Sequence, residues 1–391
     1  MDIEYWWLLA LPIFFALGWM AARIDIKHLL SESRVLPKSY FRGLNFLMNE
    51  QPDKAIEAFI EVVKVDPQTI ELHFALGSLF RRRGEVERAI RMHQNLTERQ
   101  DLPQEQKLLA LHELAQDYLK AGLLDRAEEL FLKLEQSAHA EAALKFLLGI
   151  YEQEKDWRKA IGIAQKLEAV TGRSHQKEIA NFYCEMAGND IMHTQPETAR
   201  PHLDAALSHH RLCVRANMLL GDIEQNAGNM EAAITAWKRI ESQNPAYLAL
   251  VAERMFRAFR QQGKSIEGLN LLRGFLAKYP SLDLLNVVFQ GTLEEQGAEQ
   301  AYALARDELR RTPTLLGVDK LLEAQLIDAP AERRHDLELI KNLVHQHTRG
   351  LAMYKCDNCG FRARQFYWHC PACAAWETYS PRRTEEKALP A

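Results

Sequence analysis

The sequence predicts an all-α protein, in which antiparallel helix pairs stack into a superhelix between an N-terminal transmembrane helix and a small C-terminal four-cysteine knuckle. Three observations lead to this prediction. Residues 5–22 carry no charge, small residues recur at intervals of 33 to 39 positions from residue 55 to residue 268, and four of the six cysteines fall within residues 356–373. Each observation accounts for one part of the chain.

Composition limits the class of protein. The 391 residues, of which 47% are hydrophobic, are enough for two or three domains. The formal net charge of −4 supplies no overall positive field, so we do not expect nucleic acid as a partner. Cys184 and Cys213 stand alone while the other four cysteines form two close pairs, which is typical of a metal site in a reducing compartment and not of a disulfide framework.

The uncharged segment 5–22 is long enough to cross a membrane. At about 1.5 Å per residue it rises roughly 27 Å, close to the ~30 Å hydrocarbon core of a bilayer. A cleaved signal peptide would begin with basic residues, whereas Asp2 and Glu4 precede this segment; a buried core helix is the other alternative. Tryptophans near both ends are typical of anchors at the membrane interface: Trp6, Trp7 and Trp19.

Basic residues follow the segment and none precedes it. The first five are Arg23, Lys27, Arg34, Lys38 and Arg42. Because positively charged flanks stay in the cytoplasm, we expect a single-pass protein whose N-terminus lies outside the cytoplasm and whose bulk lies inside it. Residues 1–23 are assigned to the transmembrane anchor and residues 24–35 to a juxtamembrane segment.

Residues 36–348 are predicted to repeat a helix pair about eight to nine times. Small residues mark the second helix of successive pairs: Ala55, Ala89, Ala127, Ala160, Ala199, Ala233 and Gly268. Twelve positions earlier the residue is usually small, as at Gly43 and Gly221, and four positions later it is often aromatic, as at Phe59 and Trp237. Small residues let two helices approach closely, and an aromatic ring fills the gap beside them. The pattern resembles the tetratricopeptide repeat.

Glycine is expected to close the first helix of several pairs. It supplies the left-handed backbone that ends a helix, and it stands at the predicted turns Gly84, Gly122, Gly228 and Gly263. From about residue 282 to residue 348 the repeat markers become sparse, which is typical of terminal repeats that act as caps.

The first helices of such an array line its concave face. The positions that do not pack inward give eight candidate groove residues: Arg81, His112, Gln116, Lys145, Asn181, Arg215, Asp222 and Arg257. Their donors would suit an extended peptide that carries carboxylates. The alternative is that these residues form ordinary solvated helix faces.

The C-terminal region carries the strongest chemical signal. Two C-x-x-C pairs, Cys356 with Cys359 and Cys370 with Cys373, are separated by ten residues. Each pair turns back so that both thiolates face one point, and two pairs together make a tetrahedral cage for one metal ion. The predicted metal ligands are these four cysteines.

The knuckle around them resembles a rubredoxin-type site or a zinc ribbon. Gly360 permits a tight turn after the first cysteine pair, whereas Ala374 occupies the same place after the second. We assign residues 349–380 to this metal-binding domain and residues 381–391 to a tail. The predicted hydrophobic cover consists of Phe361, Phe366, Tyr367, Trp368 and Trp376.

Four thiolates do not choose between zinc and iron. We expect one structural zinc ion, with iron as the alternative. A unit of about thirty residues has little core, so metal binding supplies most of its folding free energy, roughly 10 to 16 kcal/mol. Redox-active iron would make the chain a rubredoxin-like electron carrier, which is a second hypothesis. A zinc ribbon that binds nucleic acid is a third, but Asp357 and Glu377 counter its basic residues Lys355, Arg362 and Arg364.

Motifs of catalysis are incomplete. Gly263-Lys264-Ser265 imitates the end of a phosphate-binding loop, but the first glycine is missing and the segment spans a predicted helical turn. His112-Glu113 lacks the second histidine of a zinc protease helix, and no G-x-S-x-G occurs. We therefore do not expect an enzyme.

The order of the parts is itself informative. An apolar span after acidic residues, repeats that begin within twenty residues of it, and the ending Tyr367-Trp-His-Cys-Pro-Ala-Cys373 resemble the lipopolysaccharide assembly protein B family of Gram-negative bacteria. Residues 40–46 and 76–90 also carry the resemblance, which covers essentially the whole chain.

The resemblance implies a regulator of lipopolysaccharide biosynthesis in the bacterial inner membrane, with a periplasmic N-terminus. In that family the protein helps a membrane-bound AAA+ protease degrade the deacetylase that commits precursor to lipid A. The implied partners are this protease, this deacetylase and other inner-membrane regulators of lipopolysaccharide. The residues alone indicate only a membrane-tethered scaffold for protein assembly, and they leave open whether the array self-associates.

Overall fold

The computed structural model divides the chain into two compact units, which are described separately. Unit 1 comprises residues 1–150 and unit 2 comprises residues 151–391. The boundary falls within α8 (Ala140–Glu154). Within the two units the structure describes residues 15–20, 38–65, 70–348 and 350–388.

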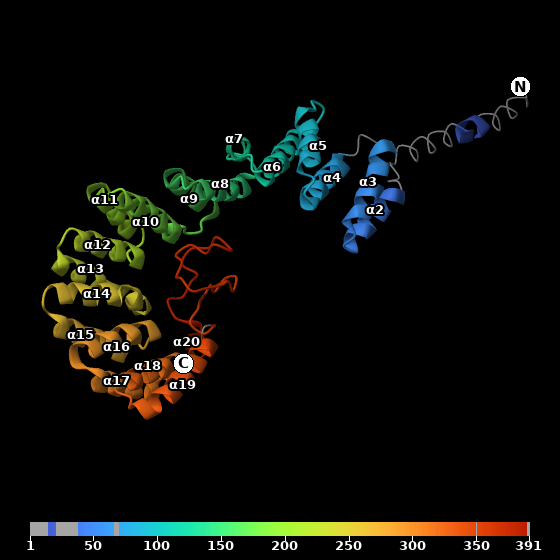
Figure 1. Ribbon diagram of the computed structural model, residues 1–391. Coiled ribbons are helices and arrows are strands. Elements are labelled where there is room, and N and C mark those ends of the chain that lie inside the picture. The colour runs from blue at the N-terminus through green and yellow to red at the C-terminus, as the bar shows by residue number, and fades with distance from the viewer. Residues whose placement is uncertain (1–14, 21–37, 66–69, 349, 389–391) are drawn as a thin grey trace, which may run out of the picture. The chain divides into compact units, whose positions relative to one another are not determined.

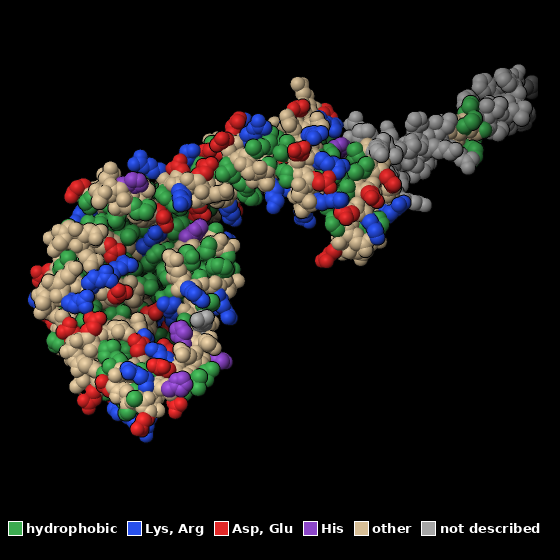
Figure 2. Space-filling model, in the orientation of Figure 1, with side chains coloured by type: hydrophobic (Ala, Val, Ile, Leu, Met, Phe, Trp, Pro, Cys, Tyr) green, Lys and Arg blue, Asp and Glu red, His purple; other side chains and the backbone are tan. Residues whose placement is uncertain are grey.

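The predicted transmembrane segment is described only in part. Residues 15–20 form a helix whose side chains are exposed and hydrophobic (Figure 2). The remainder of the prediction, residues 5–14 and 21–22, lies outside the described residues. Among the residues that are described, no helix combines the length and the apolar character needed to cross a membrane.

Unit 1 is built from consecutive helices that pack as neighbours in the sequence. Besides the first part of α8 these are α2 (Lys38–Met48), α3 (Pro52–Val65), α4 (Ile70–Arg83), α5 (Val86–Glu98), α6 (Gln104–Lys120) and α7 (Leu124–Lys133). The pairs predicted from the repeat are present, because α2 packs on α3, α4 on α5 and α6 on α7.

Unit 2 continues with the same kind of helix pair and ends in the knuckle. Its helices are α9 (Trp157–Thr171), α10 (Gln176–Met192), α11 (Pro196–His209), α12 (Val214–Asn226), α13 (Met230–Gln243), the 3-10 helix η1 (Pro245–Tyr247), α14 (Leu248–Gln261), α15 (Ser265–Lys278), α16 (Leu282–Gln296), α17 (Ala298–Arg311), α18 (Leu315–Ile327) and α19 (Ala331–Thr348). Within this unit the helices follow an arc, and the knuckle lies on the inner side of that arc (Figure 1).

The knuckle contains the only strands found among the described residues. They are β1 (Tyr354–Lys355) and β2 (Arg362–Ala363), which pair antiparallel, and α20 (Thr384–Ala388) follows them. The prediction of an all-α repeat fold with a C-terminal four-cysteine knuckle is therefore confirmed for the described parts of both units.

Close helix approach at small residues explains the pairs. The six alanines predicted to mark the second helices are all fully buried: Ala55, Ala89, Ala127, Ala160, Ala199 and Ala233. A Cβ placed on Gly43 would lie 2.3 Å from the Phe59 ring, and one on Gly221 would lie 2.1 Å from the Trp237 ring. The predicted partnership of a small residue with an aromatic ring is confirmed at both places.

The predicted turn glycines close their helices in the expected conformation. Positive φ values between 71° and 85° occur at Gly84, Gly122, Gly228 and Gly263. Other residues adopt this backbone region only with strain, so glycine ends these helices at little cost. The Gly263-Lys264-Ser265 segment is thus one of the repeat turns, between α14 and α15.

Candidate metal centre

The two C-x-x-C loops fold into the same backbone turn. The carbonyl of Cys356 accepts a hydrogen bond from the Gly360 N–H at 3.0 Å, and the carbonyl of Cys370 accepts one from the Ala374 N–H at 2.9 Å. The residue after each cysteine pair has positive φ, 78° at Gly360 and 54° at Ala374. The second loop therefore places a side chain where the first has glycine, and it carries backbone strain that the first avoids.

This folding brings the four predicted cysteines together. Their Sγ atoms all lie within 4.8 Å of one another, with 3.9 Å between Cys356 and Cys373 and 3.7 Å between Cys359 and Cys370. A tetrahedral site with metal–sulfur bonds of about 2.3 Å requires sulfur separations of about 3.8 Å. Asn358 Nδ2 donates to the Sγ of Cys373 at 3.3 Å. The donor set fits one tetrahedral ion, zinc or iron.

Electrostatics also favour a cation at the centre of the cage. Burial opposes ionisation of Cys356, but the Thr378 hydroxyl and two backbone N–H groups stabilise the thiolate and lower its pKa to about 6. A backbone N–H from Phe361 favours the thiolate of Cys359, but burial and the neighbouring thiols raise the pKa of Cys359 to about 12. Four adjacent thiolates repel one another, so a divalent cation is needed to hold all of them deprotonated.

Three of the predicted cover residues contact the repeats of unit 2: Phe366, Trp368 and Trp376. Phe366 and Tyr367 pack against the buried core of the knuckle, as predicted. Phe361 is exposed, which contradicts its assignment to the cover. Trp368 and Trp376 face the helices of unit 2, in the contacts that follow.

Trp376 connects the knuckle to the first helices of unit 2. Its Nε1 donates to Glu152 Oε1 at 2.9 Å, at the end of α8. Its ring meets Trp157 of α9 and Phe182 of α10 edge to face, with centroids 6.1 Å and 5.6 Å away. His369 stacks on the same ring at 4.4 Å. A half-buried indole N–H still needs a hydrogen-bond acceptor, and Glu152 supplies it from 224 positions away.

Trp368 contacts residues of η1 and α12. Its ring stacks on Tyr247 with centroids 5.4 Å apart, and the Arg215 guanidinium lies 5.8 Å from its centroid. Nine positions after Trp368, Glu377 Oε1 accepts a hydrogen bond from Asn181 Nδ2 at 2.9 Å. Asn181 is fully buried.

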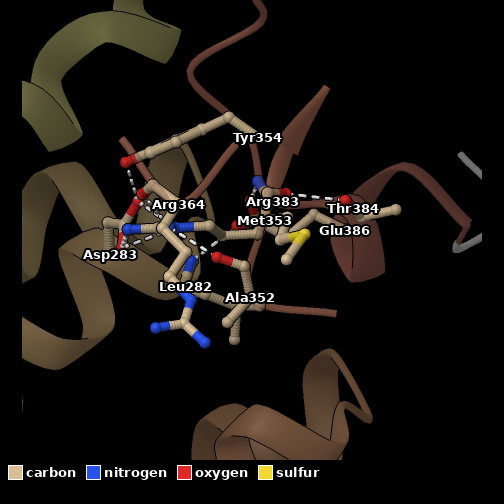
Figure 3. A network of polar contacts seen from close by, with 9 residues as sticks. All are labelled: Leu282, Asp283, Ala352, Met353, Tyr354, Arg364, Arg383, Thr384 and Glu386. Carbon is tan, nitrogen blue, oxygen red and sulfur yellow. Dashed lines mark hydrogen bonds and ion pairs between the residues drawn. The ribbon is translucent and has the colours of Figure 1, made fainter. Parts of the chain in front are cut away.

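A third contact joins the C-terminal segment to α16 (Figure 3). Arg383 donates to both carboxylate oxygens of Asp283, and the Tyr354 hydroxyl donates to Asp283 Oδ2 at 2.8 Å. The Arg383 guanidinium also lies 3.9 Å from the centroid of the Tyr354 ring and donates to the Ala352 carbonyl at 2.6 Å. The face of the Tyr354 ring, the Asp283 carboxylate and the Ala352 carbonyl together stabilise the half-buried guanidinium of Arg383.

Two glutamates of α20 bind the starts of repeat helices. Glu386 accepts the N–H of Leu282, the first residue of α16, at 2.5 Å. Glu385 accepts the N–H groups of Leu315 and Leu316, the first residues of α18. The first N–H groups of a helix have no partner within it, and the helix dipole favours negative charge there. The segment predicted as a tail therefore contacts two helix starts.

Four of the predicted groove residues lie in unit 2: Asn181, Arg215, Asp222 and Arg257. The knuckle covers the first two, through Glu377 and Trp368. Asp222 forms an ion pair with Arg254 at 2.6 Å, and Arg257 forms one with Glu253 at 2.7 Å. Part of the surface predicted to receive a peptide from another protein is thus occupied by a segment of the same chain.

The other four lie in unit 1: Arg81, His112, Gln116 and Lys145. His112 is buried and stacks on His139 at 5.2 Å, while Lys145 is exposed and pairs with Glu141 at 2.6 Å. Gln116 Nε2 is 3.4 Å from Glu113 Oε1, a side chain that Arg81 also binds. Whether these eight residues receive a peptide stays a prediction.

Arg81 belongs to a buried polar network that the sequence did not indicate. It donates to Asp117 Oδ1 at 2.7 Å, and the other oxygen of Asp117 lies 2.5 Å from His93 Nδ1. Asp117 and His93 are both fully buried. His93 stands where other pairs have an aromatic ring over the small residue, here Gly77. The network joins α4, α5 and α6.

Comparison with protein families agrees with both parts of the fold. The rubredoxin metal binding domain family matches residues 354–381, and the tetratricopeptide repeat family matches residues 42–95 and 193–247. Neither description names an enzyme. A solved tetratricopeptide repeat protein from Parabacteroides merdae is 14% identical, covers 74% of this chain and 100% of its own, and has a TM-score of 0.32.

Two curated relatives match over nearly their whole length. Lipopolysaccharide assembly protein B of Escherichia coli K12 is 34% identical over 378 residues, which is 96% of this chain and 97% of the relative. Lipopolysaccharide assembly protein B of Haemophilus influenzae is 32% identical over 393 residues, with 97% and 98% covered. This identity, over repeats and knuckle together, shows that the chain belongs to the lipopolysaccharide assembly protein B family.

Proposed function

We propose that the protein is a membrane-anchored, non-catalytic scaffold that regulates lipopolysaccharide biosynthesis. The observation that carries this proposal is the full-length similarity to lipopolysaccharide assembly protein B, which spans the repeats and the four-cysteine knuckle alike. Helical repeats present long surfaces to other proteins, and this suits a scaffold.

In this proposal the scaffold lowers the level of the deacetylase that commits precursor to lipid A. It holds the deacetylase beside a membrane-bound AAA+ protease, and other inner-membrane regulators of lipopolysaccharide act on the same complex. Confining two partners to one membrane surface raises their effective concentration about 10²- to 10⁴-fold when both bind at once. The family resemblance supports these partners.

The proposed anchor is the segment of residues 1–23, with the N-terminus in the periplasm and the bulk of the chain in the cytoplasm. The basic residues after residue 22 support this orientation. A reporter fused after Ala391 should therefore be active in the cytoplasm, and activity in the periplasm would contradict the orientation.

The proposed metal has a structural role. One zinc ion, with iron as the alternative, would be bound by Cys356, Cys359, Cys370 and Cys373 and would hold the two cysteine loops in one fold. In that fold Trp368 and Trp376 contact the repeat helices of unit 2, through Tyr247 and Glu152.

Deletion of residues 1–22 tests the mechanism in cells that lack the native gene. The shortened chain should stay folded but should no longer lower the deacetylase level, measured by immunoblot after synthesis is stopped. An unrelated apolar span of equal length in place of residues 5–22 is the control, and it should restore at least part of the regulation. Normal deacetylase turnover with the span-less chain would refute the membrane-scaffold mechanism.

A further inference from the structure

Helix α2 is apolar on two opposite faces. One face packs on α3, where Gly43 meets the Phe59 ring and Phe46 joins the buried core of the first helix pairs. On the opposite face Phe41, Leu44 and Met48 are exposed, with 59%, 39% and 85% of their surface accessible. Spacings of three and four residues place these three side chains in one stripe along the helix.

Such a stripe is unusual for a helix whose outer face meets water. In α5, another helix of the same unit, the outward side chains are polar: Glu87, Arg88, Arg91, Gln94 and Asn95. Single exposed apolar residues need no explanation, but an aligned group of them marks a surface that contacts another apolar phase. The outer face of α2 thus differs in kind from that of α5.

The charge of the residues before and within α2, and the position of α2 in the chain, indicate that this apolar phase is a membrane. Helix α2 begins at residue 38, sixteen residues after the uncharged segment ends at residue 22. Even fully extended, a connection of that length reaches at most about 55 Å. Residues 23–42 hold five lysines and arginines but only Asp25 and Glu32 as acids. Basic residues beside a membrane are attracted to anionic lipids, at about 1 kcal/mol each.

We propose that α2 lies on the anionic lipid surface of the membrane and inserts Phe41, Leu44 and Met48 into the boundary between headgroups and acyl chains. An amphipathic helix with a basic flank binds membranes in this way. The inference rests on the proposed membrane anchoring and deepens it. The span would hold the chain at the bilayer, and α2 would orient the first helix pair on its surface.

The test uses the full-length chain in vesicles of phosphatidylethanolamine with about one quarter phosphatidylglycerol. An environment-sensitive fluorescent amino acid replaces Met48, and acyl-chain nitroxide lipids serve as quenchers. The matched control replaces Met192, a methionine at the end of α10 in unit 2 that is 79% exposed. Emission should fall at least about twofold at position 48 and change little at position 192.

Two further arms strengthen the test. The variant Phe41→Glu, at an exposed position that does not enter the core, should reduce quenching of the probe at position 48, because a carboxylate in the stripe opposes insertion. Vesicles of phosphatidylcholine alone should reduce it as well, because the basic flank then has no anionic lipid to bind.

Flotation of the vesicles separates failure of this inference from failure of the anchor. A chain that floats while the probe at position 48 stays unquenched would overturn the inference about α2 and leave the anchor standing. If the emission at position 48 depended on protein concentration and not on quencher lipid, the inference about α2 would be overturned. The exposed stripe would then contact a second copy of the chain. A chain that does not float at all would overturn the anchor and, with it, this inference.

Discussion

The guanidinium of Arg383 donates two hydrogen bonds of 2.9 Å to the carboxylate of Asp283, which lies 100 positions earlier in the chain. Asp283 stands in the first turn of α16, where a negative charge also faces the positive end of the helix dipole. Tyr354 of β1 binds the same carboxylate through its hydroxyl. This single contact therefore joins the C-terminal segment, the knuckle and the repeats.

Replacing Arg383 by alanine should destabilise unit 2 by about 1–3 kcal/mol, because Asp283 is left partly buried without its cation. Side-chain exposures of 19% and 26% let water replace part of the interaction, so the upper figure is a limit. The exposed neighbour Arg382 is the matched control, and Arg382→Ala should change stability by less than about 0.5 kcal/mol. Urea unfolding measures both, and equal losses would show that the ion pair contributes nothing specific.

Replacing Cys356 and Cys359 by serine should release the metal and unfold the knuckle. Trp368 and Trp376 would then lose their contacts with the repeat helices. Because their rings become exposed to water, tryptophan emission should shift to longer wavelength. Each repeat depends mainly on its neighbours, so helical circular dichroism should fall only slightly. Hydrogen exchange should rise in unit 2 at α10, α16 and α18 and stay unchanged in unit 1. Collapse of the helical signal would mean that the repeats of unit 2 cannot fold without the knuckle.

Replacing Ala374 by glycine should stabilise the metal-loaded knuckle by about 1 kcal/mol, because it relieves the strain of positive φ at an alanine. The reciprocal change, Gly360→Ala, should destabilise it by a similar amount. A Cβ at residue 360 would meet nothing closer than 3.8 Å, so the effect there is purely conformational. Competition with a zinc chelator measures both variants, and shifts in the same direction would contradict the prediction.

The stability of unit 2 should depend on pH through Glu152, which accepts the Trp376 hydrogen bond. Burial raises the pKa of Glu152, and Glu178 adds to this, while the Trp376 hydrogen bond and His369 oppose it. A carboxyl whose pKa is raised by folding binds its proton more tightly in the folded state. Stability should therefore rise as pH falls from neutral through the raised pKa, and level off below the unfolded value of about 4.3.

Glu152→Gln isolates this effect. An amide oxygen still accepts the Trp376 N–H, but the buried charge is gone, so the variant should be more stable than the parent at neutral pH and should lack this pH dependence. Thermal unfolding of both proteins between neutral pH and about pH 4.3 measures the difference. An unchanged slope in the variant would assign the pH dependence to other groups.

Replacing Gly221 by alanine should destabilise unit 2 by about 1–3 kcal/mol, because the new methyl group would overlap the Trp237 ring. The control Gly162→Ala, in α9 of the same unit, meets nothing within 4 Å. Helix propensity alone should make that variant more stable, by about 0.5–1 kcal/mol. Chemical denaturation measures the free energy of unfolding of both variants. If Gly221→Ala left it unchanged, α12 and α13 could move apart without a loss of stability.

The helix pairs and the cysteine cage follow from patterns in the amino-acid sequence alone. Gly221 and Trp237 are 16 positions apart and belong to consecutive helices, so their contact follows from local geometry repeated along the chain. Cys356 and Cys359 are likewise brought together by one short turn. Patterns of this kind are visible in the sequence because the interacting residues keep fixed, short spacings.

The position of the knuckle on the repeats depends on contacts between residues that lie far apart in the chain. Trp376 meets Glu152 across 224 positions, and Asn181 meets Glu377 across 196, at spacings that no repeat dictates. The sequence therefore places Asn181 among the candidate groove residues, and the structure shows that its side chain is fully buried and binds Glu377 of the same chain. Long-range contacts depend on the curvature of the stacked helices and on which surfaces that curvature brings face to face. Curvature arises from small rotations summed over many repeats, and no single repeat of the sequence specifies it.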